Sequence, residues 1–182
     1  EQYLFDKQVT VTAGKLDPSY YLDQNEFAND ETTQFVGRIF RNSPVIEWPD
    51  DNTAGARILF APEFMKAVQF EGGYFNATGD WEDIFDRPFA SAQIIVNPHV
   101  LIGCDEKRWC GNWSFYWWTN GLDHPKLGAV EADPPDSTKH ANWGYGASID
   151  QSITETLGVF ARLGWEVPDL AHVSANPSSS PC

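Results

Sequence analysis

The sequence predicts an all-β fold made of strands whose two faces differ in polarity. In residues 155–167 the side chains alternate strictly: one parity is apolar, and the other carries Gly, Arg and Glu. Successive side chains of a strand point to opposite faces of its sheet. This segment therefore suits a sheet between hydrocarbon and water, as in an antiparallel transmembrane β-barrel of the outer-membrane type. A soluble sandwich strand with one buried face has the same periodicity, so this observation leaves both folds open.

Six further segments are predicted to be strands, and the same alternation recurs clearly in three of them. A second face of glycine and polar residues favours a barrel over a sandwich, whose exterior would be richer in Lys and Thr. The step at 151–155 is short enough for a tight turn, whereas 76–88 and 121–140 are long, acidic and contain proline. Short turns at one end and long loops at the other are typical of barrels. The predicted strands are 7–16, 55–62, 67–75, 89–97, 109–120, 142–151 and 155–167.

Residues 17–40 interrupt the β pattern and are predicted to form an extended turn followed by one or two helical turns. Asn29 or Asp30 is placed to cap a helix that runs through Arg38. We expect residues 1–182 to form a single domain, in which 17–40 either folds inward to narrow a pore or packs as a surface loop. The acidic and amide side chains of this segment lack the regular spacing of a calcium loop, so no metal is expected.

The composition excludes several kinds of partner. The 182 residues include 12 Lys plus Arg and 26 Asp plus Glu, a net charge of −14, so nucleic acid and anionic membrane surfaces are poor partners. No apolar run of about 18 residues predicts a transmembrane helix, and barrel strands escape that test because half their side chains are polar. Aromatic residues make up 14% of the chain, with 8 Trp, which indicates interfacial girdles or flat platforms for sugars.

Two of the three cysteines lie close together at the end of a predicted hairpin. Cys104 and Cys110 bracket a polar stretch, and a disulfide between them would close a short loop in an oxidising compartment. No second pair of Cys or His stands at ligand spacing, so a zinc site is not indicated.

Four motifs resemble segments of the carbohydrate-selective porins, the OprB family. They are GKLDPSYYLDQNEFANDETTQF at 14–35, GNWSFYWW at 111–118, GYGASIDQ at 144–151 and GVFARLGW at 158–165, in the family's order. The resemblance implies a homotrimeric β-barrel in the bacterial outer membrane, in contact with lipid, that passes small sugars by diffusion without a cofactor. Ser114 stands where the family motif usually has Arg, which removes a basic pore-lining contact.

The chain is less than half the usual length in that family and resembles a middle portion, without the first strands and the closing strand. We therefore expect a partial barrel, because an isolated part would leave two unpaired sheet edges in lipid. A complete eight-stranded barrel would need an eighth strand that the sequence does not reveal.

The candidate pore-lining residues are those that fall on the water-facing parity of the predicted strands. Opposed Arg and Glu side chains would set a transverse field and offer hydrogen bonds to sugar hydroxyls, and aromatic rings would guide the solute. The alternative is that these residues only solvate the inner wall. The candidates are Arg57, Glu71, Tyr116, Trp118, Asp150, Arg162 and Glu166.

Two other functions remain open. A jelly-roll glycoside hydrolase or lyase would use two carboxylates, for which Glu71, Asp150 and Glu166 are available. No motif fixes such a pair at catalytic spacing, and the four histidines form no triad, so an enzyme is not predicted. A soluble glycan-binding β-sandwich would need exposed rings on the polar parity, which Tyr116 and Trp118 supply.

Overall fold

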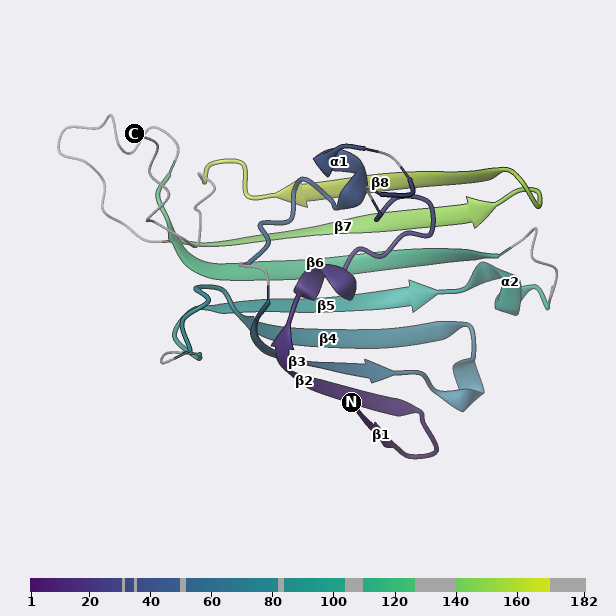
Figure 1. Ribbon diagram of the computed structural model, residues 1–182, viewed down its shortest axis with the longest axis horizontal. Coiled ribbons are helices and arrows are strands. Elements are labelled where there is room, and N and C mark those ends of the chain that lie inside the picture. The colour runs from purple at the N-terminus through teal and green to yellow at the C-terminus, as the bar shows by residue number, and fades with distance from the viewer. Residues whose placement is uncertain are drawn as a thin grey trace.

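The computed structural model describes residues 1–30, 32–34, 36–49, 52–81, 84–103, 110–126 and 140–170, with the backbone alone at 38 and 39. These residues form one eight-stranded antiparallel sheet in which each strand pairs with the next along the chain (Figure 1). The strands are β1 (Gln2–Leu4), β2 (Val9–Leu16), β3 (Thr53–Phe60), β4 (Val68–Asn76), β5 (Pro88–Val96), β6 (Gly111–His124), β7 (His140–Ser152) and β8 (Gly158–Glu166). The short helices are η1 (Pro18–Tyr20), α1 (Arg38–Arg41), η2 (Glu63–Met65) and α2 (Pro98–Leu101).

The all-β prediction is confirmed, and each of the seven predicted strands is present with slightly shifted ends. The sequence missed β1, because three exposed residues are too few to show an alternating pattern. β1 and β8 lie at opposite edges, so the described sheet is open rather than closed into a barrel. No helix in the described part of the chain is long and apolar enough to cross a membrane.

The expected helix from Asn29 or Asp30 through Arg38 is wrong. The Asp30 carboxylate accepts hydrogen bonds from the Thr32 amide (2.8 Å) and the Thr33 hydroxyl (2.6 Å), which fixes a tight turn. The Thr32 hydroxyl also donates to this carboxylate, and together with the Thr33 hydroxyl and the Thr32 amide it lowers the pKa of Asp30 to about 2. Gly37 has a φ of 142°, which a helix cannot contain, and the only helix among the described residues of this stretch is α1, one turn long.

The connections alternate between the two ends of the sheet, as antiparallel neighbours require. Residues 5–8, 61–67, 97–110 and 153–157 connect strands at one end, which we call the short-turn end. Residues 17–52, 77–87 and 125–139 connect them at the other, the long-loop end. Three of the four connections at the short-turn end are shorter than any at the long-loop end, whereas 97–110 is longer than 77–87, so the predicted inequality holds in part.

One face of the sheet is apolar and uncovered. The strand register places aliphatic and aromatic side chains of β3 to β8 on this face, and they are between 36% and 72% exposed. We call it the open face. Its large exposed side chains are Ile58, Phe60, Phe70, Ile94, Trp113, Phe115, Trp117, Trp143, Tyr145, Val159, Leu163 and Trp165.

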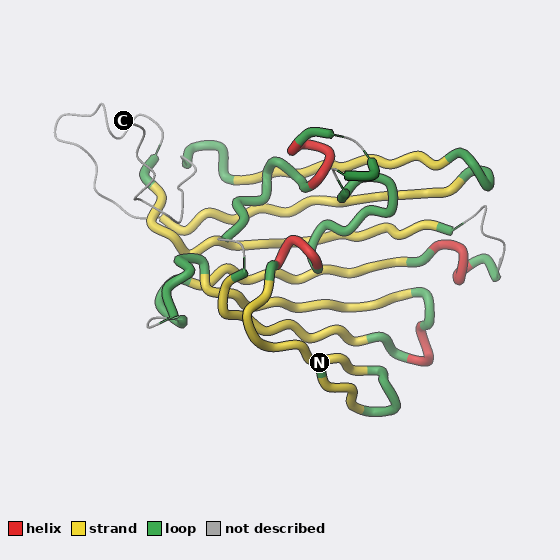
Figure 2. The backbone as a smooth tube through the Cα atoms, in the orientation of Figure 1, coloured by secondary structure: helices red, strands yellow, loops and turns green. Residues whose placement is uncertain are grey.

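The opposite face is covered by residues 17–49, which we call the strap. The strap leaves β2, crosses the sheet as loop with two short helical turns, and returns toward β3 (Figure 2). Leu22 and Ile46 of the strap pack with buried rings of the sheet, among which Phe89 and Trp118 stack at 6.4 Å. Burying each such side chain stabilises the fold by roughly 1.5–3 kcal/mol. The hydrophobic core thus lies between strap and sheet.

The glycines on the covered face make room for aromatic rings. A Cβ atom at Gly146 would lie 2.5 Å from the Tyr116 hydroxyl, and one at Gly144 would lie 2.9 Å from the Trp118 indole nitrogen. Both rings therefore lie flat over the neighbouring strand. The glycine-rich parity that the sequence shows is explained by this packing.

Candidate functional site beneath the strap

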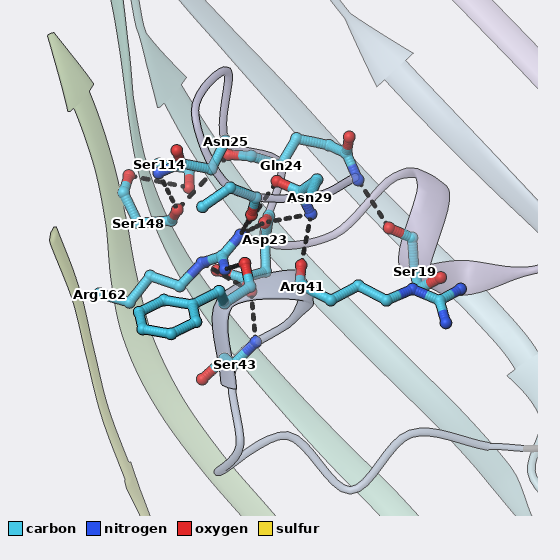
Figure 3. Close-up of polar contacts among 12 residues, drawn as sticks. Ser19, Asp23, Gln24, Asn25, Asn29, Arg41, Ser43, Ser114, Ser148 and Arg162 are labelled. Carbon is cyan, nitrogen blue, oxygen red and sulfur yellow. Dashed lines mark hydrogen bonds and ion pairs between the residues drawn. The ribbon is translucent and has the colours of Figure 1, made fainter. Parts of the chain in front are cut away.

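Arg162 of β8 joins the sheet to the strap through a fan of hydrogen bonds. Its guanidinium donates to the carbonyls of Phe40 (2.6 Å) and Ala28 (2.6 Å) and to the side-chain oxygen of Asn29 (2.9 Å), and it lies 3.3 Å from the Asp23 carboxylate (Figure 3). These acceptors all belong to the strap. A planar group with five donors suits such a set of acceptors better than a lysine ammonium would.

Asp23 is fully buried at the centre of this cluster. Its carboxylate accepts a 2.7 Å hydrogen bond from the Ser43 amide, which ties the two limbs of the strap together. Burial raises the pKa of Asp23 to about 6, and the Arg162 charge and the Ser43 amide oppose that shift. The carboxylate is therefore ionised at neutral pH and compensated by Arg162.

Asp150 of β7 holds a second point of the strap. Its carboxylate accepts hydrogen bonds from the Asn112 amide of β6 (2.8 Å) and from the Glu26 amide of the strap (3.0 Å). Beside it, Asn25 donates to the Ser148 hydroxyl at 3.1 Å (Figure 3). Asp150 therefore bridges two strands and the strap rather than facing open solvent.

Glu47 anchors the later part of the strap near the long-loop end. Its carboxylate lies 2.6 Å from His124 Nε2 and accepts a 2.9 Å bond from Asn142. His124 Nδ1 lies 3.0 Å from the His140 carbonyl. Because both ring nitrogens face acceptors, the geometry favours a doubly protonated His124 paired with the Glu47 carboxylate.

Arg57 and Glu71 form an ion pair of 3.1 Å on neighbouring strands, with their side chains 12% and 9% exposed. Gln93 donates to Glu71 (3.2 Å) and to the Tyr21 carbonyl (2.7 Å), and the Arg57 guanidinium lies 4.3 Å from the centre of the Tyr21 ring. Within the described part of the chain, Arg57 Nε and Gln93 Oε1 have no hydrogen-bond partner. These two atoms are themselves buried, and the ion pair retains only slight exposure.

The seven predicted lining residues therefore have different surroundings. Arg57 and Glu71 are brought together, and Arg162 and Asp150 each bind the strap. Trp118 is 0% exposed and Tyr116 is buried, so in this arrangement both are core rings without surface for a solute. Glu166 is half-buried on the edge strand β8.

Sequence reasoning did not single out Asp23 as the partner of Arg162, nor the cluster of Glu47, His124 and Asn142. These residues come together only because the strap folds back over the sheet, and nothing in their spacing signals it. Cys104 lies outside the described residues, and with it the proposed bond to Cys110. Among the described residues no group of His, Cys, Asp or Glu is placed to hold a metal ion.

The chain matches no protein-family model, no curated protein and no solved structure in the comparisons made. Its function must therefore be argued from the two faces of the sheet and from the clusters beneath the strap.

Proposed function

We propose that this chain forms part of the wall of an outer-membrane channel through which small sugars diffuse passively, without a cofactor or a chemical step. The observation that carries the proposal is the difference between the two faces. The open face presents large apolar side chains to the exterior, whereas the covered face combines a hydrophobic core with buried ion pairs and amide clusters under the strap.

The open face has the composition expected for contact with lipid. Fully burying a large apolar side chain is favourable by roughly 1.5–3 kcal/mol, so a face made of such residues is costly to leave in water. Phe60 and Phe70 stack at 6.3 Å near the short-turn end, and Trp143 and Trp165 lie 5.2 Å apart near the long-loop end. Aromatic side chains near strand ends are typical of interfacial girdles. On this face β6 adds the rings of Phe115 and Trp117.

In lipid the free edges of β1 and β8 would leave backbone groups without hydrogen-bond partners. The proposal therefore requires that strands outside this sheet pair with both edges and close a barrel. The strap, which covers the polar face, would then lie inside and narrow the passage. A homotrimer is the assembly that the family resemblance implies.

Sugars are the proposed solute because the slightly exposed Arg57–Glu71 pair combines two opposite charges with the aromatic ring of Tyr21. An ion pair across a narrow passage sets a local field and offers donors and acceptors to hydroxyl groups. The net charge of −14 disfavours anions and leaves neutral solutes unaffected.

A sandwich-type enzyme or glycan-binding module is less well supported. Either would need cover for the open face, whereas the described residues form one sheet. Glu71 is engaged by Arg57 and Gln93, and Asp150 by two backbone amides, so neither carboxylate is placed as an acid or base.

The proposal is tested by single-channel recording of the native protein in a planar bilayer while glucose is added. Discrete conductance steps that glucose blocks would support a sugar-binding pore. Steps that glucose does not affect would leave a general diffusion pore. A correctly folded sample that gives no steps would refute the channel.

A further inference from the structure

Each of the four connections at the short-turn end places large apolar side chains in solvent. Phe5 in the first turn is 77% exposed and Phe64 in the second is 80% exposed, and neither belongs to the core. Turns normally favour Gly, Pro, Asn, Asp and Ser, so these residues are not required by turn geometry. We call the set the apolar rim: Phe5, Phe64, Met65, Val100, Leu101, Ile102, Ile153 and Leu157.

The rim is distributed along the whole sheet rather than gathered at one place. Its members come from the turns between β1 and β2, β3 and β4, β5 and β6, and β7 and β8. A protein partner would be expected to use a compact patch or groove. An apolar contact repeated at every turn along one end fits a planar medium instead.

The rim also continues the open face. Phe60 ends β3 and Phe70 lies at the start of β4, so the stacked pair flanks the turn that carries Phe64 and Met65. Lys66 is exposed in that same turn. A long basic side chain beside apolar ones suits the headgroup layer, where the stem contacts acyl chains and the ammonium contacts phosphate.

The opposite end differs in character. In the connection 77–87, Trp81 and Phe85 are exposed beside the exposed acids Asp80 and Asp86, and Arg87 pairs with Asp123 at 2.9 Å. The short-turn end exposes charges as well, at Asp6, Lys7, Glu63 and Glu155, so it is distinguished by the apolar side chains that recur in each of its four turns.

We propose that the short-turn end is embedded in the interfacial layer of a phospholipid membrane, with the apolar rim reaching the upper acyl chains. This inference rests on the proposed function, because it takes the open face to be the lipid-facing wall. It adds that the turns themselves, and not only the strands, are anchored in lipid, which fixes the depth of the sheet in the bilayer.

The test uses the native protein reconstituted in phosphatidylcholine vesicles that contain spin-labelled lipids. Single cysteines carry an environment-sensitive fluorophore in a background where Cys104, Cys110 and Cys182 are replaced by serine. The probes are Phe64→Cys and Leu157→Cys in the rim, Ile94→Cys in the middle of the open face, and Val36→Cys on the strap. Val36, 86% exposed in the strap, is the water-facing control.

We expect lipids labelled near the headgroup to quench the two rim probes several-fold more strongly than the Val36 probe. Lipids labelled deep in the acyl chain should quench the Ile94 probe most. If the rim probes match the Val36 probe while Ile94 is quenched, the rim lies in water and the inference is wrong, although the channel proposal survives. If Ile94 is not quenched, the open face is not in lipid, and the channel proposal and the inference both fail.

Discussion

We predict that Arg162→Met releases the strap from β8. The buried guanidinium makes hydrogen bonds of 2.6 Å to each of two strap carbonyls and pairs with the fully buried Asp23. Methionine keeps most of the side-chain volume but leaves Asp23 without its counterion. Removing one member of a buried pair costs about 3–5 kcal/mol, because the remaining charge is desolvated and unpaired.

The assay is hydrogen–deuterium exchange of the strap amides in the folded protein. When exchange reports the opening equilibrium, a loss of about 3–5 kcal/mol increases strap exchange by roughly two to four orders of magnitude. Strand amides on β6 and β7 should change far less, because their ladder bonds do not depend on Arg162.

The matched control is Arg87→Met. Arg87 also pairs with a carboxylate, that of Asp123 at 2.9 Å, but this pair is about one-third exposed. Exposed pairs contribute about 0–1 kcal/mol, so this variant should leave strap exchange nearly unchanged.

A double-mutant cycle isolates the ion pair. Asp23→Asn combined with Arg162→Met should be less damaging than the sum of the two single changes, because the double variant leaves no uncompensated charge. If Arg162→Met exchanges no faster than Arg87→Met, the buried cluster does not hold the strap. Strict additivity in the cycle would refute the coupling between Asp23 and Arg162.

Three further predictions follow the same contacts. The pKa of the Asp23 carboxyl is about 6 in the folded protein, above its ordinary value of 3.8. The stabilisation that this shift contributes, on the order of 3 kcal/mol, is therefore full below about pH 4 and is lost as the pH rises through 6. Asp23→Asn should remove this pH dependence from the unfolding free energy measured in urea. Gly146→Ala should lower the unfolding free energy by about 1–3 kcal/mol in the same assay, because the added methyl would meet the Tyr116 ring. Gly72→Ala is the control and should cost little, because only one atom lies within 4 Å of the added methyl, at 3.9 Å. Equal losses in the two variants would contradict the packing of Tyr116 on Gly146. Arg57→Met should weaken glucose block of single-channel conductance, whereas Lys66→Met in an exposed turn should not; equal block in both variants would exclude Arg57 as a solute contact.

The strands were predictable because alternation is a local property of the chain. In residues 142–151 and 155–167, apolar side chains alternate with small or polar ones, and the structure pairs these segments as β7 and β8. β1 was missed because it is three residues long. The helix expected after Asn29 was wrong although Asp30 accepts a hydrogen bond from the Thr32 amide as an N-cap does, because Gly37 adopts a φ of 142° that interrupts any helix before Arg38.

The candidate site was predictable only in part. Arg57 and Glu71 lie on the same parity of adjacent strands, so their meeting follows from a hairpin register. Trp118 shares that polar parity and was therefore predicted to touch solute, but its ring is covered by the strap. Parity gives the face of a sheet on which a side chain lies, and it carries no information about what covers that face.

The sequence by itself determined an antiparallel all-β chain with one apolar and one polar face, because side-chain polarity alternates with a period of two residues within each strand. Only the tertiary structure decided that the strap lies across the polar face and that Arg162 and Asp150 bind it. Those contacts join residues more than a hundred positions apart, such as Glu26 with Asp150. They depend on where the strap folds back, and no local pattern specifies that path.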